Sequence, residues 1–275
     1  MRKGILSTAF LFLLFCVSAL AQPAETYTKH HLLNVCAHPR QRLLKLSLRD
    51  RDAVRSYQTQ IWQFPNNAFF FIAGMTIDAD GAPNAYHPDD TGIDELANAG
   101  RPGLWDGIIT DRRGKPIVQR EADPFPGYYI SCTSLADTTK EFADPGRYVD
   151  ATKIPYVALP EEIAESAGAQ LGDFAFVVNL RSGKSAFAIY ADIGALGEGS
   201  VALAERLGIS SNARHGGEAD GILYIFFPGS GNRQPRTTDE IQSEGERLLA
   251  DSSAIQTLSS CSENNDEPVI SSGEL

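Results

Sequence analysis

Short apolar runs separated by turn-forming residues are the dominant pattern of this chain. The run at 68–73 holds three consecutive phenylalanines, and the runs at 174–180, 186–191 and 222–227 are also rich in β-branched and aromatic residues. Runs of this length and composition predict buried strands. Further strands are expected at 105–110, 116–119, 128–133 and 156–159. Apolar positions at helical spacing predict helices at 43–57, 161–167, 200–207 and 238–258.

Many short strands with few helices predict a mainly β fold. The chain has 275 residues and a hydrophobic content of 43%, which is enough for one sizeable core and does not require two. We therefore expect a single domain built on a β-barrel or sandwich with a few peripheral helices.

The first 21 residues have the pattern of a secretory signal peptide, with a basic start, an apolar run and a small-residue cleavage site. The expected organisation is then a signal peptide at 1–21, one domain at 22–261 and a flexible acidic tail at 262–275. No later stretch is apolar for long enough to span a bilayer. We expect a secreted or periplasmic protein without a membrane partner.

The segment 187–207 places two carboxylates around one glycine-rich loop. A predicted strand runs into Asp192, the loop 194–197 follows, and Glu198 comes just before a helix that Ser200 is expected to cap. A flexible loop can turn both acids towards one cleft, and paired carboxylates are the groups that glycoside hydrolysis needs. The same loop partly resembles a dinucleotide-binding fingerprint, but Glu198 would stand where the pyrophosphate binds.

A second acidic segment follows the run at 68–73 and includes Asp78, Asp80, Asp89 and Asp90. Its spacing does not fit an EF-hand calcium loop, and binding of a cationic substrate is the other interpretation. Tyrosines near these acids, Tyr86 and Tyr190, can either belong to the core or stack on sugar rings.

The net charge of −11 becomes −13 once Arg2 and Lys3 are removed with the signal peptide. Such a protein is a poor candidate for binding nucleic acid and suits a cationic partner, although acidity can also serve solubility alone.

Three cysteines remain after the signal peptide is removed, and three cannot all pair within one chain. Cys132 lies in a predicted strand and is expected to be a buried free thiol. Cys36 and Cys261 lie near the two ends, and we expect a disulfide between them in an oxidising compartment. The chain has no CxxC or HExxH pattern, so no metal site is predicted.

Several pieces in a fixed order resemble one enzyme family. They are 75–82, 155–159, 190–192 with 197–200, and 223–227. Together they resemble the chitosanases of glycoside hydrolase family 75. The resemblance implies that Asp192 and Glu198 are the essential pair, and that β-1,4 links of chitosan are cleaved with inversion and without a cofactor.

The sequence therefore predicts a secreted, monomeric endo-chitosanase. Asp192, at the end of an apolar strand, is the expected general acid, and Glu198, before a helix N-terminus, the expected general base. Substrate-binding roles are expected for Asp78, Asp80, Asp89, Tyr86 and Tyr190. The alternatives are a hydrolase of another amino-sugar polymer, or a carbohydrate-binding protein without catalytic activity.

Overall fold

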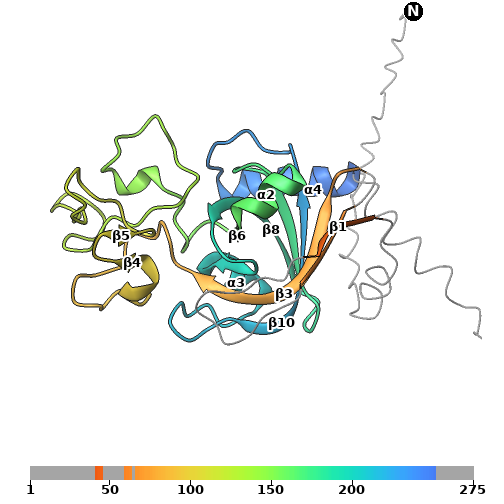
Figure 1. Cartoon of the computed structure of the whole chain (residues 1–275), viewed down its shortest axis with the longest axis horizontal. Helices are drawn as coiled ribbons and strands as arrows, with labels where there is room; N and C mark the ends of the chain where they lie inside the picture. The colour runs from red at the N-terminus through yellow and green to blue at the C-terminus, as the bar shows by residue number, and fades with distance from the viewer. Residues whose placement is uncertain (1–40, 46–58, 64–65, 252–275) are drawn as a thin grey trace, which may run out of the picture.

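The computed structural model describes residues 41–45, 59–63 and 66–251. Eight of the ten described strands form one sheet (Figure 1). The strand order is β1 (Gln41–Lys45), β2 (Gln60–Gln63), β3 (Phe69–Asp78), β10 (Glu218–Phe227), β7 (Phe174–Asn179), β8 (Ser185–Ile193), β6 (Tyr156–Leu159) and β9 (Glu198–Ser200). Because β9 also pairs with β3, the six strands from β3 to β9 close into a barrel.

Strand β3 closes the barrel because its two halves have different partners on one edge. Trp62 of β2 pairs with Phe70 in the first half, whereas β9 runs parallel to the second half, with Glu198 opposite Thr76. The other edge of β9 reaches β6, where Gly199 pairs with Val157. A Cβ at Gly199 would lie 3.0 Å from side-chain atoms of Leu203 and Met75, so only glycine fits here without displacing its neighbours.

Alternate residues of the barrel strands fill two separate apolar clusters. One cluster holds an aromatic stack, in which Phe69 lies on Phe226 with ring centroids 4.9 Å apart and Phe71 lies on Tyr224 at 4.8 Å. Successive side chains of a strand point to opposite faces, so a strand that contributes to both clusters is buried on both of its faces. The apolar runs predicted as strands at 68–73, 156–159, 174–180, 186–191 and 222–227 are confirmed.

In the described part of the chain, three α-helices pack against the barrel: α2 (Glu161–Ala167), α3 (Val201–Leu207) and α4 (Thr238–Asp251). Helix α3 contacts β3, β6, β8 and β9, and the Oγ atom of Ser200 accepts a hydrogen bond from the Leu203 N–H at its N-terminus, as expected. Helix α4 lies against β7 and β8, where Gly245 leaves room for the ring of Phe187.

The segment between β3 and β6 forms an irregular lobe beside the barrel, coloured yellow to green in Figure 1. It contains the short strands β4 (Gly100–Arg101) and β5 (Leu104–Trp105) and the 3-10 helices η1 (Leu96–Ala99) and η2 (Pro145–Arg147). The strands predicted at 116–119 and 128–133 appear here as single bridges, such as Val118 with Tyr129. Pro116 begins the first of these runs and Gly127 directly precedes the second, which limits continuous pairing.

The expected mainly β single domain with peripheral helices is thus confirmed, in its barrel form. Residues 43–45 of the predicted helix at 43–57 belong instead to β1, and the rest of that segment lies outside the described residues. The signal peptide, Cys36, Cys261 and the tail at 262–275 also lie outside them. No described helix is long and apolar enough to cross a membrane.

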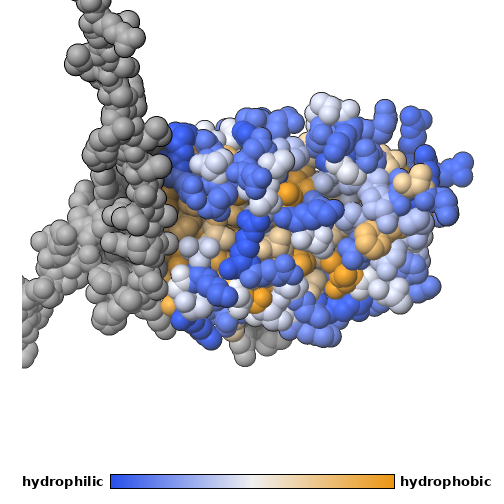
Figure 2. All heavy atoms as spheres, turned by 180° about the vertical axis from the view of Figure 1, so that it is seen from behind, coloured by the Kyte–Doolittle hydropathy of each residue, from blue (hydrophilic) through white to orange (hydrophobic). Residues whose placement is uncertain are grey.

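Where described residues are visible in Figure 2, the surface is mainly hydrophilic, with small separate hydrophobic patches.

Candidate active site

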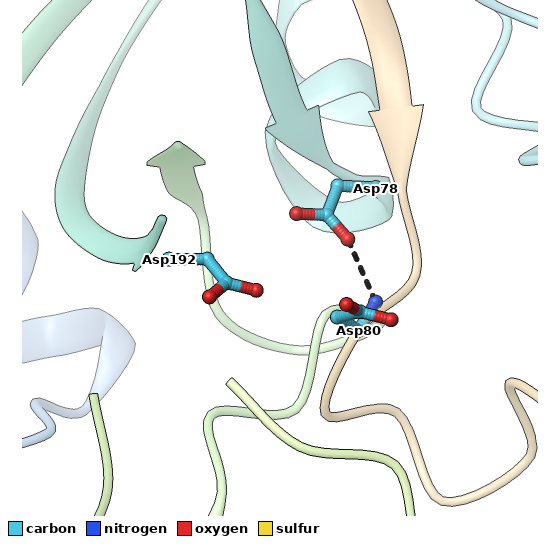
Figure 3. Close-up of side chains that lie close together, drawn as sticks. All are labelled: Asp78, Asp80 and Asp192. Atoms are coloured by element: carbon cyan, nitrogen blue, oxygen red, sulfur yellow. Dashed lines mark hydrogen bonds between the residues drawn. The ribbon is translucent and has the colours of Figure 1, made fainter. Parts of the chain in front are cut away.

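Three aspartates from two distant segments of the chain converge beside the barrel (Figure 3). Asp78 is the last residue of β3, Asp80 follows it by two positions, and Asp192 lies near the end of β8. One carboxylate oxygen from each lies within 4.8 Å of the others. We call these three residues the carboxyl cluster.

Asp78 is held by the chain that follows it. Its Oδ1 atom accepts a hydrogen bond of 2.8 Å from the N–H of Asp80, and the hydroxyl of Tyr156 donates to the Asp80 carbonyl at 2.9 Å. Burial raises the pKa of Asp78 well above its usual value, and the charges of Asp192 and Glu198 add to this, while the donors nearby oppose it. Asp78 is therefore within electrostatic reach of both predicted catalytic acids.

Asp80 is positioned by Tyr86, whose hydroxyl donates to Asp80 Oδ1 at 2.6 Å and lies 3.2 Å from an oxygen of Asp94. Burial and the charges of Asp78 and Asp192 raise the pKa of Asp80 well above its usual value. A Cβ at Gly107 would lie 2.5 Å from Asp80 Oδ1, so a glycine at that position makes room for the carboxylate.

Asp192 is fixed through one of its two oxygens. Oδ1 accepts hydrogen bonds from the Ser134 N–H at 2.9 Å, the Ser134 hydroxyl at 2.6 Å and the Ile193 N–H at 2.8 Å. Burial raises the pKa of Asp192, and these three donors limit the increase. Oδ2 has no hydrogen bond to any described residue, so it is the oxygen available to a ligand.

Glu198, the first residue of β9, folds back onto the preceding loop. Its Oε2 atom accepts a hydrogen bond of 2.7 Å from the Ala195 N–H. A Cβ at Gly194 would lie 2.2 Å from the same oxygen, and Gly197 adopts a φ of 92°, which favours glycine. The loop amide therefore orients the carboxylate, whereas Ser200 caps the helix behind it.

The cluster concentrates negative charge. Within the described part of the chain, no lysine, arginine or histidine forms an ion pair with Asp78, Asp80 or Asp192. Carboxylates this close cannot all ionise at once, so the group retains a proton at a pH at which an isolated aspartate has lost it. Such a group can donate a proton beside an ionised carboxylate. The three oxygens also lie close enough together to surround a small cation.

The other predicted substrate-binding residues lie in different surroundings. The side chain of Asp89 is 83% exposed, and its Oδ2 atom lies 3.9 Å from Nδ1 of His87. The rings of Tyr86 and Tyr190 are each only 2% exposed, so both lie in the core. The hydroxyl of Tyr190 nevertheless lies near Asp192 and Glu161, and burial followed by these two charges raises its pKa to about 12.

Ser134, Tyr156 and Asp94 were not predicted from the sequence. Ser134 and Tyr156 reach the site through hydrogen bonds to residues 58 and 76 positions away, and Asp94 reaches it through Tyr86. A single sequence does not signal such contacts.

Cys132 lies next to the cluster and carries a free thiol. It is partly rather than fully buried, and its Sγ atom lies 3.4 Å from the Asp106 carbonyl oxygen, to which it donates. Burial, with the charges of Asp80 and Asp192, raises the pKa of the thiol to about 12. The thiol is therefore protonated at neutral pH and is a weak nucleophile.

Residues 126–256 match the family model described as fungal chitosanase of glycosyl hydrolase group 75. The match covers just under half of the chain and includes Ser134, Asp192, Glu198 and every barrel strand except β3, whereas Asp78 and Asp80 precede it. No curated protein matches the sequence. The substrate class implied by the family is a polysaccharide. The match confirms the resemblance to glycoside hydrolase family 75, and the chain is a chitosanase-like glycoside hydrolase.

Proposed function

We propose that this protein is a secreted, monomeric endo-chitosanase that hydrolyses β-1,4 links with inversion, using Asp192 as general acid and Glu198 as general base. The observation that carries the proposal is the desolvated carboxyl cluster at the end of β8, within electrostatic reach of Glu198. Two acids in different environments are what glycoside hydrolysis requires.

The proposed reaction has two parts, protonation of the leaving oxygen and attack by water. Asp192 gives its proton to the glycosidic oxygen, and the bond between that oxygen and the anomeric carbon breaks. A water molecule attacks the anomeric carbon from the opposite face and loses a proton to Glu198. Ser134 fixes one oxygen of Asp192, which leaves Oδ2 to carry the proton. The Ala195 N–H holds the Glu198 carboxylate in place through a hydrogen bond to Oε2.

Asp78 is a second candidate for the base, because one of its oxygens lies within 4.8 Å of one from Asp192. Inverting glycosidases keep their two acids about 6.5–9.5 Å apart, with a water molecule between them. The short distance between the Asp78 and Asp192 oxygens leaves less room for that water. We therefore assign the base to Glu198, and Asp78 remains a buried member of the carboxyl cluster whose pKa burial raises well above its usual value.

Charge favours a cationic polysaccharide. Chitosan carries ammonium groups near and below neutral pH, and the protein has an excess of acidic residues and a negatively charged site. The same excess disfavours nucleic acid as a partner. Another amino-sugar polymer remains the alternative substrate, and carbohydrate binding without catalysis the alternative function.

Release of reducing ends from soluble chitosan tests the activity, and comparison with partly acetylated polymer tests the substrate. Asp192→Asn and Glu198→Gln are each expected to lower the rate about 10²–10⁴-fold, while the exposed control Glu121→Gln keeps it. A substrate with a highly acidic leaving group should rescue only Asp192→Asn, and azide only Glu198→Gln. Wild-type rates in either variant would remove that residue from the mechanism, and the opposite rescue pattern would exchange the two roles.

A further inference from the structure

A pocket of about 430 Å³ lies beside the carboxyl cluster, lined partly by helix α2 and by the chain around Ser134. Its volume falls in the range of about 300–1,000 Å³ that small-molecule sites occupy. Ser134, Tyr190 and Ile193 line it, and each is either bonded to Asp192 or within two positions of it along β8. The pocket is therefore a direct neighbour of the proposed general acid.

The helix side of the pocket is acidic. Glu161 and Glu165 line it from α2, where a spacing of four residues places them on one face of the helix. Within the described residues, neither carboxylate is part of an ion pair. Both are exposed, so a cation that enters the pocket can reach them without displacing a protein partner.

Two arginines also line the pocket, and the protein fixes each of them. Nη1 of Arg147 donates to the Lys140 carbonyl at 2.6 Å, and Nε of Arg233 donates to Gln170 Oε1 at 2.8 Å. Arg233 also adopts a φ of 60°, an unfavourable conformation for a residue other than glycine that is often found at binding sites. The remaining N–H groups of Arg233 make no hydrogen bond to described residues and can donate to hydroxyl groups.

We propose that this pocket is a substrate subsite that binds one glucosamine unit of the chain cleaved at Asp192. Glu161 and Glu165 bind its ammonium group, Arg233 binds sugar hydroxyls, and the side of Ile193 contacts the ring. The inference rests on the proposed function and adds to it the residues that recognise the amino group.

Two further observations support continuity between pocket and cluster. Tyr190 lines the pocket together with Glu161, and the charges of both Asp192 and Glu161 act on its hydroxyl. Ile193 is 46% exposed, which is high for an isoleucine at the end of a buried strand, and apolar surface of this kind suits the face of a sugar ring.

The test measures hydrolysis of chitosan oligosaccharides from the dimer to the octamer by wild type and by the Glu161→Gln, Glu165→Gln double variant. We expect the KM of the double variant to rise about three- to tenfold for the longer oligosaccharides, and less for those too short to reach the pocket. Glu162→Gln is the matched control, because Glu162 is exposed on the same helix and does not line the pocket. The control should keep the wild-type KM.

Equal KM values for the double variant and wild type at every length would overturn the subsite, as would an equal rise in Glu162→Gln. A loss of the same size on N-acetylated oligosaccharides, which lack the ammonium group, would overturn the roles of Glu161 and Glu165. If wild type does not hydrolyse chitosan, the proposed function fails instead. Calorimetric binding of the same oligosaccharides then tests the pocket alone: weaker binding by the double variant supports it, and equal binding refutes it.

Discussion

Ser134 and Asp192 are joined by two hydrogen bonds although 58 positions separate them in the chain. The N–H and the hydroxyl of Ser134 both donate to Asp192 Oδ1, at 2.9 and 2.6 Å. Because both bonds fall on one oxygen, the carboxyl group cannot rotate freely. Ser134 is thus a positioning residue for the proposed general acid.

Ser134→Ala removes the hydroxyl and keeps the N–H. The Ser134 hydroxyl lowers the pKa of Asp192, so its loss should raise that pKa. We expect kcat to fall about three- to tenfold, and the alkaline limb of the pH–rate profile to move to higher pH. Ser134→Thr, which keeps a hydroxyl, should restore most of the rate. An unchanged profile in Ser134→Ala would show that the hydroxyl does not influence the acid.

Asp80→Asn distinguishes catalytic support from simple attraction of the substrate. Asp80 lies within the carboxyl cluster, so we expect its neutral variant to lose at least about tenfold in kcat. Asp89→Asn, on the exposed part of the same loop, should instead change KM, and less so at high salt, because exposed charges are screened. Steady-state kinetics at two ionic strengths measures both. A pure KM effect in Asp80→Asn would leave Asp80 with a substrate-binding role alone.

The carboxyl cluster should make stability depend on pH in the opposite direction to an ordinary salt-bridged aspartate. The pKa of Asp78 is raised in the folded state, so above its unfolded value near 3.8 the folded protein binds more protons than the unfolded chain. The free energy of unfolding therefore falls as the pH rises through the folded pKa. We expect Asp78→Asn to be more stable than wild type at neutral pH, by about 1 kcal/mol, with the difference vanishing below about pH 4.

Thermal unfolding across this pH range measures the effect, with the exposed Glu121→Gln as control. An Asp78→Asn variant that is less stable than wild type at neutral pH would contradict a raised pKa of Asp78 in the folded state.

Gly194→Ala tests the placement of Glu198. The added methyl group would lie 2.2 Å from Glu198 Oε2, so the carboxylate must move. A displacement of about 1 Å at a catalytic group can cost on the order of 100-fold in rate, and we expect a loss of that order in kcat with an intact fold. Gly146→Ala, where the nearest atom would be 3.2 Å away, is the matched control. Full activity in Gly194→Ala would argue against Glu198 as the base.

The cysteines give a prediction that is independent of catalysis. Peptide mapping without reduction should find Cys36 linked to Cys261 and Cys132 free. In the chain-entropy model, a bridge across so long a loop stabilises the fold by about 4–5 kcal/mol. A Cys36–Cys132 link would refute this pairing.

Much of the barrel could be predicted from local pattern. Apolar runs such as 222–227 predict strands because their length and their content of β-branched and aromatic residues are properties of the run itself. The pairing of those runs could not be predicted. Closure of the barrel depends on β9, a strand of only three residues, and on Gly199, where the absence of a side chain leaves room for Leu203 and Met75. A hydrophobic pattern detects neither the short strand nor the role of this glycine.

For the site, the sequence by itself determined only that Asp192 and Glu198 are candidates for the catalytic pair, because both acids flank one local loop in a recognisable strand-to-helix context. Only the tertiary structure decided that Asp78 and Asp80 join Asp192 while Asp89 stays on the surface, and that Ser134 holds the acid. The physical reason is that the burial of these carboxylates and the interaction between their charges depend on distances between strands that are remote in sequence. Closure of the barrel sets those distances.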